Sequence, residues 1–233
     1  MNKKFAFTLT EVLVTLSIIG VVSALTVPTL MNQYQRKAQA VQIRKSANEI
    51  MSAIDMLTTE EGKTTFKKTS VFTDVLPNNT AVDGIENLIT QHLKVIKTCD
   101  KDEKTGCFAS ENYRSINNAN SSAFTCDGTA YVLANSSAIC VSRTIGEKEK
   151  YLTVQIDTNG IDKPNIGGRD MFVFDINENG DFRNSEIKCE GGSGGGSICS
   201  EDEITFSSAT CIASALGSNC FGVLAENNWI MDY

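Results

Sequence analysis

With 233 residues, of which 41% are hydrophobic and 21% charged, the chain suits one globular domain with an appendage and excludes a collagen or a solenoid. Residues 1–62 carry six basic and five acidic side chains, and the remaining 171 residues carry 15 basic and 23 acidic ones. Because an acidic body repels phosphate backbones, we expect no nucleic-acid partner.

The first predicted element is a helix of membrane-spanning length. Residues 5–27 form an apolar run of 23 residues in which Glu11 is the only ionised side chain. As an α-helix this run is about 35 Å long, enough to cross a hydrocarbon core of about 30 Å. Lys3 and Lys4 precede it, so the positive-inside rule places the N-terminus in the cytoplasm and the chain after Pro28 outside.

An ordinary secretory signal peptide is the alternative interpretation of this run, because Ser23 and Ala24 resemble a signal-peptidase site. Two features weigh against it. Glu11 lies inside the apolar run, where a carboxylate needs a partner. The helical pattern also continues beyond the cleavage position, since no glycine or proline lies between Pro28 and Gly62.

The second half of the predicted helix is amphipathic. Apolar residues recur there every three or four positions, as a helix needs to dock on a globular body. These residues are Ile43, Ala47, Ile50, Met51, Ile54 and Leu57. Gly62 is a natural stop, so the predicted helix covers residues 7–61 and is about 80 Å long. Pro28 removes one backbone donor and marks a kink or a point of local melting.

The segment Lys3-Lys4-Phe5-Ala6-Phe7-Thr8-Leu9-Thr10-Glu11, followed by the apolar run, resembles the leader of type IV pilins and type II secretion pseudopilins. The resemblance implies that a prepilin peptidase cuts between Ala6 and Phe7 and methylates the new N-terminus. It also implies that Glu11 pairs with the N-terminus of a neighbouring subunit. Pro28 falls where many pilins carry a proline that lets the helix stretch during assembly. Ala6 stands where the family usually has glycine.

The same resemblance sets the expected organisation of the chain. It implies a leader at residues 1–6, a transmembrane and filament-core half-helix at 7–28, an amphipathic half-helix at 29–62 and an exported disulfide-rich head at 63–233. The implied partners are other pilin-like subunits in a homo- or hetero-filament, prepilin peptidase, an inner-membrane assembly platform, and membrane lipid before assembly. The protein would begin as a single-pass membrane protein and end in an extracellular or periplasmic filament.

The head is predicted to begin with a helix over residues 85–96 that places Leu88, Ile89, Leu93 and Ile96 on one face. His92 within it is expected at the surface or in a cap. Residues 99–122 are polar and predict a surface loop, and residues 190–197 predict a flexible one. Four strands are predicted at residues 129–133, 138–143, 151–157 and 171–176.

These elements predict an α+β fold in which the long N-terminal helix packs on an antiparallel sheet. Residues 204–233 are expected to close the head with their aromatic side chains. The body holds all eight cysteines, with no C-x-x-C pair, which favours disulfides over zinc and so an oxidising compartment. Many pairings remain open, although chain neighbours would close short loops. The cysteines are Cys99, Cys107, Cys126, Cys140, Cys189, Cys199, Cys211 and Cys220.

Two loops offer oxygen ligands of the kind that calcium prefers. The first contains Asp157, Asn159 and Asp162, with Asp170 nearby. The second matches a calcium-loop pattern, but Asn179-Gly180 follows a predicted strand, which favours a hairpin turn. We expect that the protein requires no cofactor, and we keep calcium only as a candidate ligand of these two loops. The candidate ligands of the second loop are Asp175, Asn177, Asn179 and Glu186.

Catalysis has little support in the sequence. The sequence has a single histidine, His92, so a Ser-His-Asp or Cys-His catalytic arrangement is excluded unless His92 is its histidine. The cysteines are better explained as cystines. We therefore expect a structural subunit of a type IV pilus-like filament and not an enzyme. Two alternatives stay open: a type II secretion pseudopilin, and a membrane-anchored exported binding domain that does not assemble.

Overall fold

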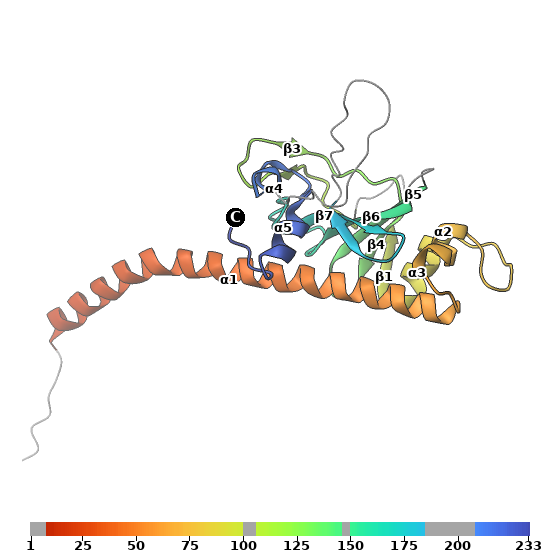
Figure 1. Ribbon diagram of the computed structural model, residues 1–233. Coiled ribbons are helices and arrows are strands. Elements are labelled where there is room, and N and C mark those ends of the chain that lie inside the picture. The colour runs from red at the N-terminus through yellow and green to blue at the C-terminus, as the bar shows by residue number, and fades with distance from the viewer. Residues whose placement is uncertain (1–7, 100–105, 146–149, 185–207) are drawn as a thin grey trace, which may run out of the picture. The chain divides into compact units, whose positions relative to one another are not determined.

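The computed structural model describes residues 8–99, 106–145, 150–184 and 208–233 (Figure 1). The chain divides into two compact units, one ending at Ala38 and the other beginning at Gln39. The N-terminal unit is the first part of a single helix. The second unit holds the rest of that helix and the head.

The long helix α1 spans Leu9–Glu60 and continues through Pro28, so the proline does not melt it. Its C-terminal end is closed by two backbone hydrogen bonds. The N–H of Lys63 donates to the Thr58 carbonyl at 3.0 Å, and the N–H of Gly62 donates to the Thr59 carbonyl at 3.0 Å. Gly62 adopts φ +61°, which a side chain disfavours. The predicted stop at Gly62 is confirmed.

The apolar stripe in the second half of α1 is buried, as the spacing predicts. Met51 is the one member of the predicted stripe that stays partly exposed. The stripe shares one core with the sheet, which lies along this part of the helix in Figure 1. Burial of each large apolar side chain contributes about 1.5–3 kcal/mol, so this stripe holds the helix to the head. The buried residues are Ala40, Ile43, Ser46, Ala47, Ile50, Ala53, Ile54 and Leu57.

Three short helices follow: η1 (Phe66–Lys68), α2 (Ser70–Thr73) and α3 (Gly84–His92). Asp83 caps α3 by accepting the N–H groups of Ile85 and Glu86. The prediction that this helix reaches residue 96 is wrong, because Val95 already begins strand β1. Ile96 lies where the register with the neighbouring strand shifts, and its side chain is 67% exposed.

The head contains a six-stranded antiparallel sheet in the order β1-β4-β5-β6-β7-β8. The four predicted strands are confirmed as β4 to β7, and the two edge strands were not predicted. A tight turn with Gly180 at φ +96° joins β7 to β8, so the predicted hairpin is confirmed. The strands are β1 (Val95–Cys99), β4 (Ala130–Leu133), β5 (Ala138–Ile145), β6 (Lys150–Asp157), β7 (Met171–Asn177) and β8 (Phe182–Asn184).

The sheet has apolar contacts on both faces. One face shares the α1 core, and the other packs on a second cluster that includes Phe108 and Tyr113. Both of these aromatic side chains are almost fully buried, so the prediction of a surface loop over residues 99–122 holds only in part: residues 110–112 and 117–121 are exposed, but the segment also supplies core side chains. A two-stranded sheet of β2 (Tyr113–Arg114) and β3 (Ser121–Ser122) orders this segment.

Among the described residues, three disulfides join chain neighbours: Cys99 to Cys107, Cys126 to Cys140 and Cys211 to Cys220. Cys189 and Cys199 lie outside the described residues. Each bridge lies in the head, where it limits the freedom of the unfolded chain.

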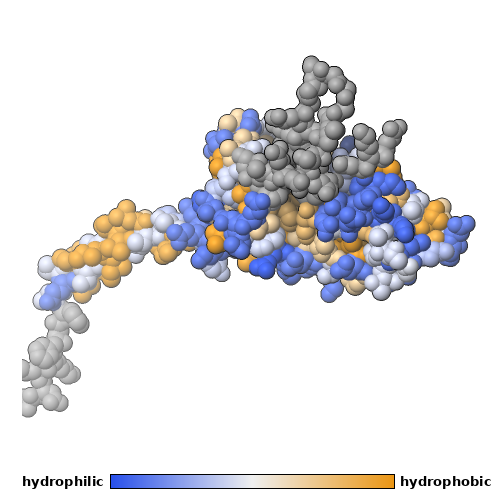
Figure 2. All heavy atoms as spheres, in the orientation of Figure 1, coloured by the Kyte–Doolittle hydropathy of each residue, from blue (hydrophilic) through white to orange (hydrophobic). Residues whose placement is uncertain are grey.

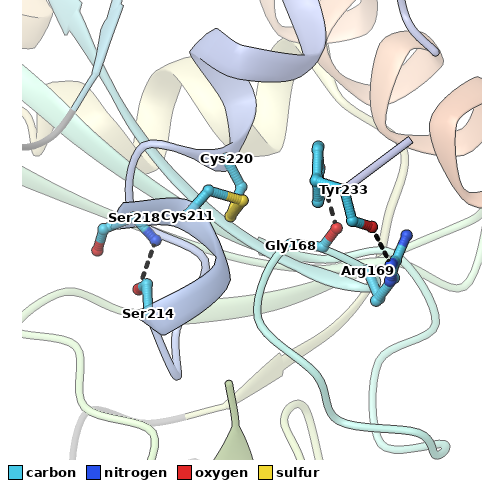
Figure 3. Close-up of a disulfide and its surroundings, with 7 residues drawn as sticks. All are labelled: Gly168, Arg169, Cys211, Ser214, Ser218, Cys220 and Tyr233. Carbon is cyan, nitrogen blue, oxygen red and sulfur yellow. Dashed lines mark hydrogen bonds between the residues drawn. A yellow bond between two sulfur atoms is a disulfide. The ribbon is translucent and has the colours of Figure 1, made fainter. Parts of the chain in front are cut away.

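The C-terminal segment closes the head through α4 (Ser208–Ala213) and α5 (Cys220–Glu226). Phe221 of α5 stacks on Phe174 of β7 with ring centroids 4.1 Å apart, and Trp229 meets Phe221 edge-on at 5.6 Å. In Figure 3 the bridge between α4 and α5 lies beside Gly168, whose carbonyl accepts the Tyr233 hydroxyl at 3.1 Å. The predicted role of the tail aromatics in packing is confirmed.

Candidate functional site

The first part of α1 presents an apolar surface. Large aliphatic side chains from Leu9 to Met31 are between 43% and 80% exposed, and Figure 2 shows apolar side chains along the face of the helix in view. Within the described part of the chain, α1 is the one helix long and apolar enough to cross a membrane, and its most apolar window is not buried. Such a surface is stable only against lipid or against other apolar helices.

Three hydroxyl groups inside this apolar run donate to backbone carbonyls of the helix itself. Thr15 donates to the Val12 carbonyl at 2.9 Å, and Ser17 donates to the Leu13 carbonyl at 2.8 Å. The Thr26 hydroxyl donates to the Val22 carbonyl at 2.9 Å. Because hydrocarbon offers no hydrogen-bond partner, these bonds lower the cost of placing the three hydroxyl groups in lipid.

Glu11 lies at the start of the same helix and forms a capping box with Thr8. The N–H and the hydroxyl of Thr8 both donate to Oε2 of Glu11, at 2.9 and 2.8 Å. In return the Glu11 N–H donates to the Thr8 hydroxyl at 3.3 Å. The sequence analysis missed this role, although the Thr-x-x-Glu spacing is its usual signal. Ala6 and Phe7, between which cleavage is predicted, lie outside the described residues.

The first candidate calcium loop is held by its own hydrogen bonds. The buried Asp157 accepts the Tyr113 hydroxyl at 2.5 Å and the Asn159 N–H at 3.1 Å. The side-chain amide of Asn159 donates to the backbone carbonyl of Asp162, whose side chain is exposed. Asp170 is also buried and accepts two backbone N–H groups at 2.7 Å. The structure thus places Asp157 and Asp170 inside the head and leaves Asp162 at the surface.

The second candidate loop is the β7–β8 hairpin. Asp175 accepts the Thr153 hydroxyl at 2.8 Å, and the Asn177 side chain accepts the N–H groups of Asn179 and Asp181 at 2.9 Å. Glu186 lies outside the described residues. Across residues 8–99, 106–145, 150–184 and 208–233, no group of three or more His, Cys, Asp or Glu is placed to hold a metal. Calcium binding stays a prediction from the sequence.

His92 does not lie at the surface, contrary to the sequence expectation. Its side chain is only 5% exposed, and its Nε2 atom is 3.7 Å from a carboxylate oxygen of Glu60. The end of α1 covers this position, which the local sequence around His92 does not show.

Burial raises the pKa values of Asp157, Asp170 and Tyr113. Removal from water, together with the nearby Asp170 carboxyl, raises the pKa of Asp157 to about 8. Burial also raises the pKa of Asp170, although backbone N–H groups that bond to its carboxylate oppose this change. Desolvation raises the pKa of the Tyr113 hydroxyl as well. The folded head therefore holds a proton on Asp157 at pH values where the unfolded chain has lost it.

We expect the head to lose stability as the pH rises from about 4 to about 8. An unfolded aspartate ionises near pH 4, whereas folded Asp157 ionises near pH 8. Across that range the folded state binds more protons, so rising pH favours unfolding, and the dependence ends above about pH 8. Urea unfolding followed by Trp229 fluorescence measures this. The variant Asp157→Asn should show a flatter pH dependence, and equal pH profiles for both proteins would contradict the assignment.

Residues 1–27 match the family model described as the prokaryotic N-terminal methylation motif. No curated protein and no solved structure matches the chain significantly. The motif is the signature of type IV pilins and pseudopilins, a structural family whose members are processed by prepilin peptidase and assemble with pilin-like subunits. The apolar helix that begins within the motif at Leu9 is long and apolar enough to anchor such a protein in the membrane near its N-terminus. The N-terminal segment of the chain therefore carries the signature of type IV pilin-like and pseudopilin-type proteins.

Proposed function

We propose that this protein is a structural subunit of a type IV pilus-like filament. Prepilin peptidase removes residues 1–6 and methylates Phe7, and the mature chain then leaves the membrane to join the filament. The observation that carries this proposal is the exposed apolar part of α1, most of which lies within the matched motif. Many copies bury this surface by bundling their helices, while their heads face outward.

Glu11 pairs with the amino terminus of a neighbouring subunit in this proposal. Both hydrogen bonds from Thr8 end on the single oxygen Oε2. An ionised carboxylate accepts up to about four hydrogen bonds, so Oε1 retains the capacity to accept from a partner's amine. The charge pair is formed in an apolar filament core, where it is much stronger than in water.

Pro28 supplies the local weakness that stretching during assembly needs. Proline has no N–H, so the carbonyl of Ala24, four residues earlier, lacks its usual donor in the helix. The helix nevertheless continues through this position. A segment with fewer internal hydrogen bonds opens at lower cost than its neighbours.

The head lies outside the cytoplasm in this proposal. Its three described disulfides are stable in an oxidising compartment and are rare in the cytosol. Lys3 and Lys4 before the apolar helix support the same orientation. An inner-membrane assembly platform would receive the chain from the lipid.

Mass spectrometry of the N-terminal peptide tests this function. Sheared surface material and membranes of the native host are analysed separately. A methylated peptide that begins at Phe7 in the sheared fraction supports the pilus subunit. The same peptide confined to membranes favours a type II secretion pseudopilin, which shares the motif. A mature peptide that retains residues 1–6 indicates a plain membrane anchor and contradicts the proposal.

A further inference from the structure

The head carries a basic depression beside α1, here called the basic groove. It has a volume of about 760 Å³ and is walled by α1, by the end of α3 and by the turn after β4. Its exposed cations are Arg44, Lys45 and Lys94. Lys45 is 3.8 Å from Glu49, a loose surface pair one helical turn away. Such a pair contributes little, so the lysine can exchange it for another carboxylate.

A second depression, here called the acidic hollow, has a volume of about 330 Å³. Asp83, Glu86 and Asp127 line it and are exposed. The cation in its wall, Arg143, is already bound by both carboxylate oxygens of Asp74, at 2.8 and 2.7 Å. The hollow therefore offers an excess of negative charge to a partner.

The two depressions lie at opposite ends of the same elements. The first turn of α3 lines the acidic hollow, and His92 at its last turn lines the basic groove. Along β4, Tyr131 lines the hollow and Leu133 lines the groove. A nine-residue helix is about 13 Å long, so the groove and hollow of one copy cannot meet each other. Complementary patches on different faces of one subunit produce a head-to-tail contact, which forms a ring if the rotation between copies closes and an open filament if it does not.

We propose that the acidic hollow of one copy docks on the basic groove of the next copy. This contact rests on the proposed filament function, and it adds an interface between the globular heads of successive copies to the bundled helices. Residues 63–233 carry 15 basic and 23 acidic side chains, so packed heads repel one another in general. Placing three carboxylates against three cations offsets that repulsion at one defined position and sets which faces meet.

The test reverses charges in the full-length chain expressed in its native host. One variant carries Lys45→Glu and Lys94→Glu in the groove, and another carries Glu86→Lys and Asp127→Lys in the hollow. Arg44 and Asp83 are left unchanged, because Arg44 lies over the Trp229 ring at 5.7 Å and Asp83 caps α3. A third variant combines all four substitutions, which restores opposite charges across the contact.

Each double variant should reduce sheared filament about tenfold, because like charges then face each other, and the combined variant should recover most of the yield. The control Lys163→Glu, which disrupts an exposed pair with Glu111 outside both depressions, should leave the yield unchanged. Normal filaments from the double variants, or no recovery in the combined variant, would overturn the contact.

The filament proposal fails separately if the wild-type chain yields no sheared filament. In that case a carbodiimide, which joins touching amines and carboxylates, is applied to wild-type membranes. A cross-link from Lys45 or Lys94 to Glu86 or Asp127 would retain the contact between two copies. Its absence, with other lysine–carboxylate links present, would overturn it.

Discussion

Replacement of Glu11 by alanine is expected to abolish sheared filament while leaving the processed protein in the membrane. In the proposed core each Glu11 carboxylate neutralises the amino terminus of a neighbour, and its loss leaves that charge unpaired in an apolar surrounding. Because growth requires every added copy to make this pair, we expect a loss of at least about a hundredfold in filament yield. Immunoblots of sheared and membrane fractions measure the effect.

A matched variant separates the charge of Glu11 from its role as a helix cap. In Glu11→Gln the side-chain oxygen still accepts from the N–H of Thr8, as Oε2 does in the native chain. The negative charge is lost, and the second acceptor oxygen, which the proposal assigns to the partner's amine, becomes an NH₂ donor. If Glu11→Gln assembles normally while Glu11→Ala does not, the capping box is the essential feature and the proposed charge pair is wrong.

Substitution of Gly217 by alanine is expected to destabilise the head by about 3 kcal/mol or more, since left-handed strain and overpacking act together. Gly217 has φ +76°, and an added Cβ would collide with the carbonyl oxygen of Met171 and lie 2.8 Å from the Gly168 nitrogen. These are backbone atoms that cannot turn away, because the Gly168 N–H donates to the Met171 carbonyl at 2.8 Å. Urea unfolding of the full-length chain in detergent, followed by the single tryptophan, gives the stability change.

The control for this prediction is Gly62→Ala. Gly62 also has a positive φ, +61°, but an added Cβ there would meet nothing within 4 Å. It should therefore cost only the backbone strain, about 1 kcal/mol. Equal losses at Gly62 and Gly217 would show that close packing of the C-terminal segment does not contribute. We expect close packing to contribute because the segment around Gly217 is fixed. Figure 3 shows that the disulfide between Cys211 and Cys220 and the hydrogen bond from the Ser218 N–H to the Ser214 hydroxyl hold it in place.

The features that sequence analysis predicted are those that depend on neighbouring residues. The buried stripe through Ile43 and Leu57 follows from helical spacing, and the helix stop follows from one glycine, Gly62. The four central strands are apolar segments bounded by turn residues. Local spacing is enough in these cases, because the burial of an amphipathic element requires only that some core exists.

The predictions that failed concern residues whose state is decided by distant partners. Residues 93–96 continue a helical pattern, but Val95 pairs with Leu133 in a strand nearly forty positions later. Tyr113 lies in a polar segment, yet its hydroxyl donates to Asp157 inside the head. Such contacts depend on which strands and segments become neighbours in the fold, and the spacing of residues along the chain does not indicate this.

The sequence by itself was enough to identify the N-terminal segment that carries the methylation motif. The motif at residues 1–27, the apolar run and Glu11 are read from consecutive residues, because each is a local pattern that involves no contact between distant parts of the chain. Only the tertiary structure decided the raised pKa of Asp157 and the two charged depressions at the ends of α3. Burial and surface charge are properties of residues assembled from separate elements, and the folded core alone brings those elements together.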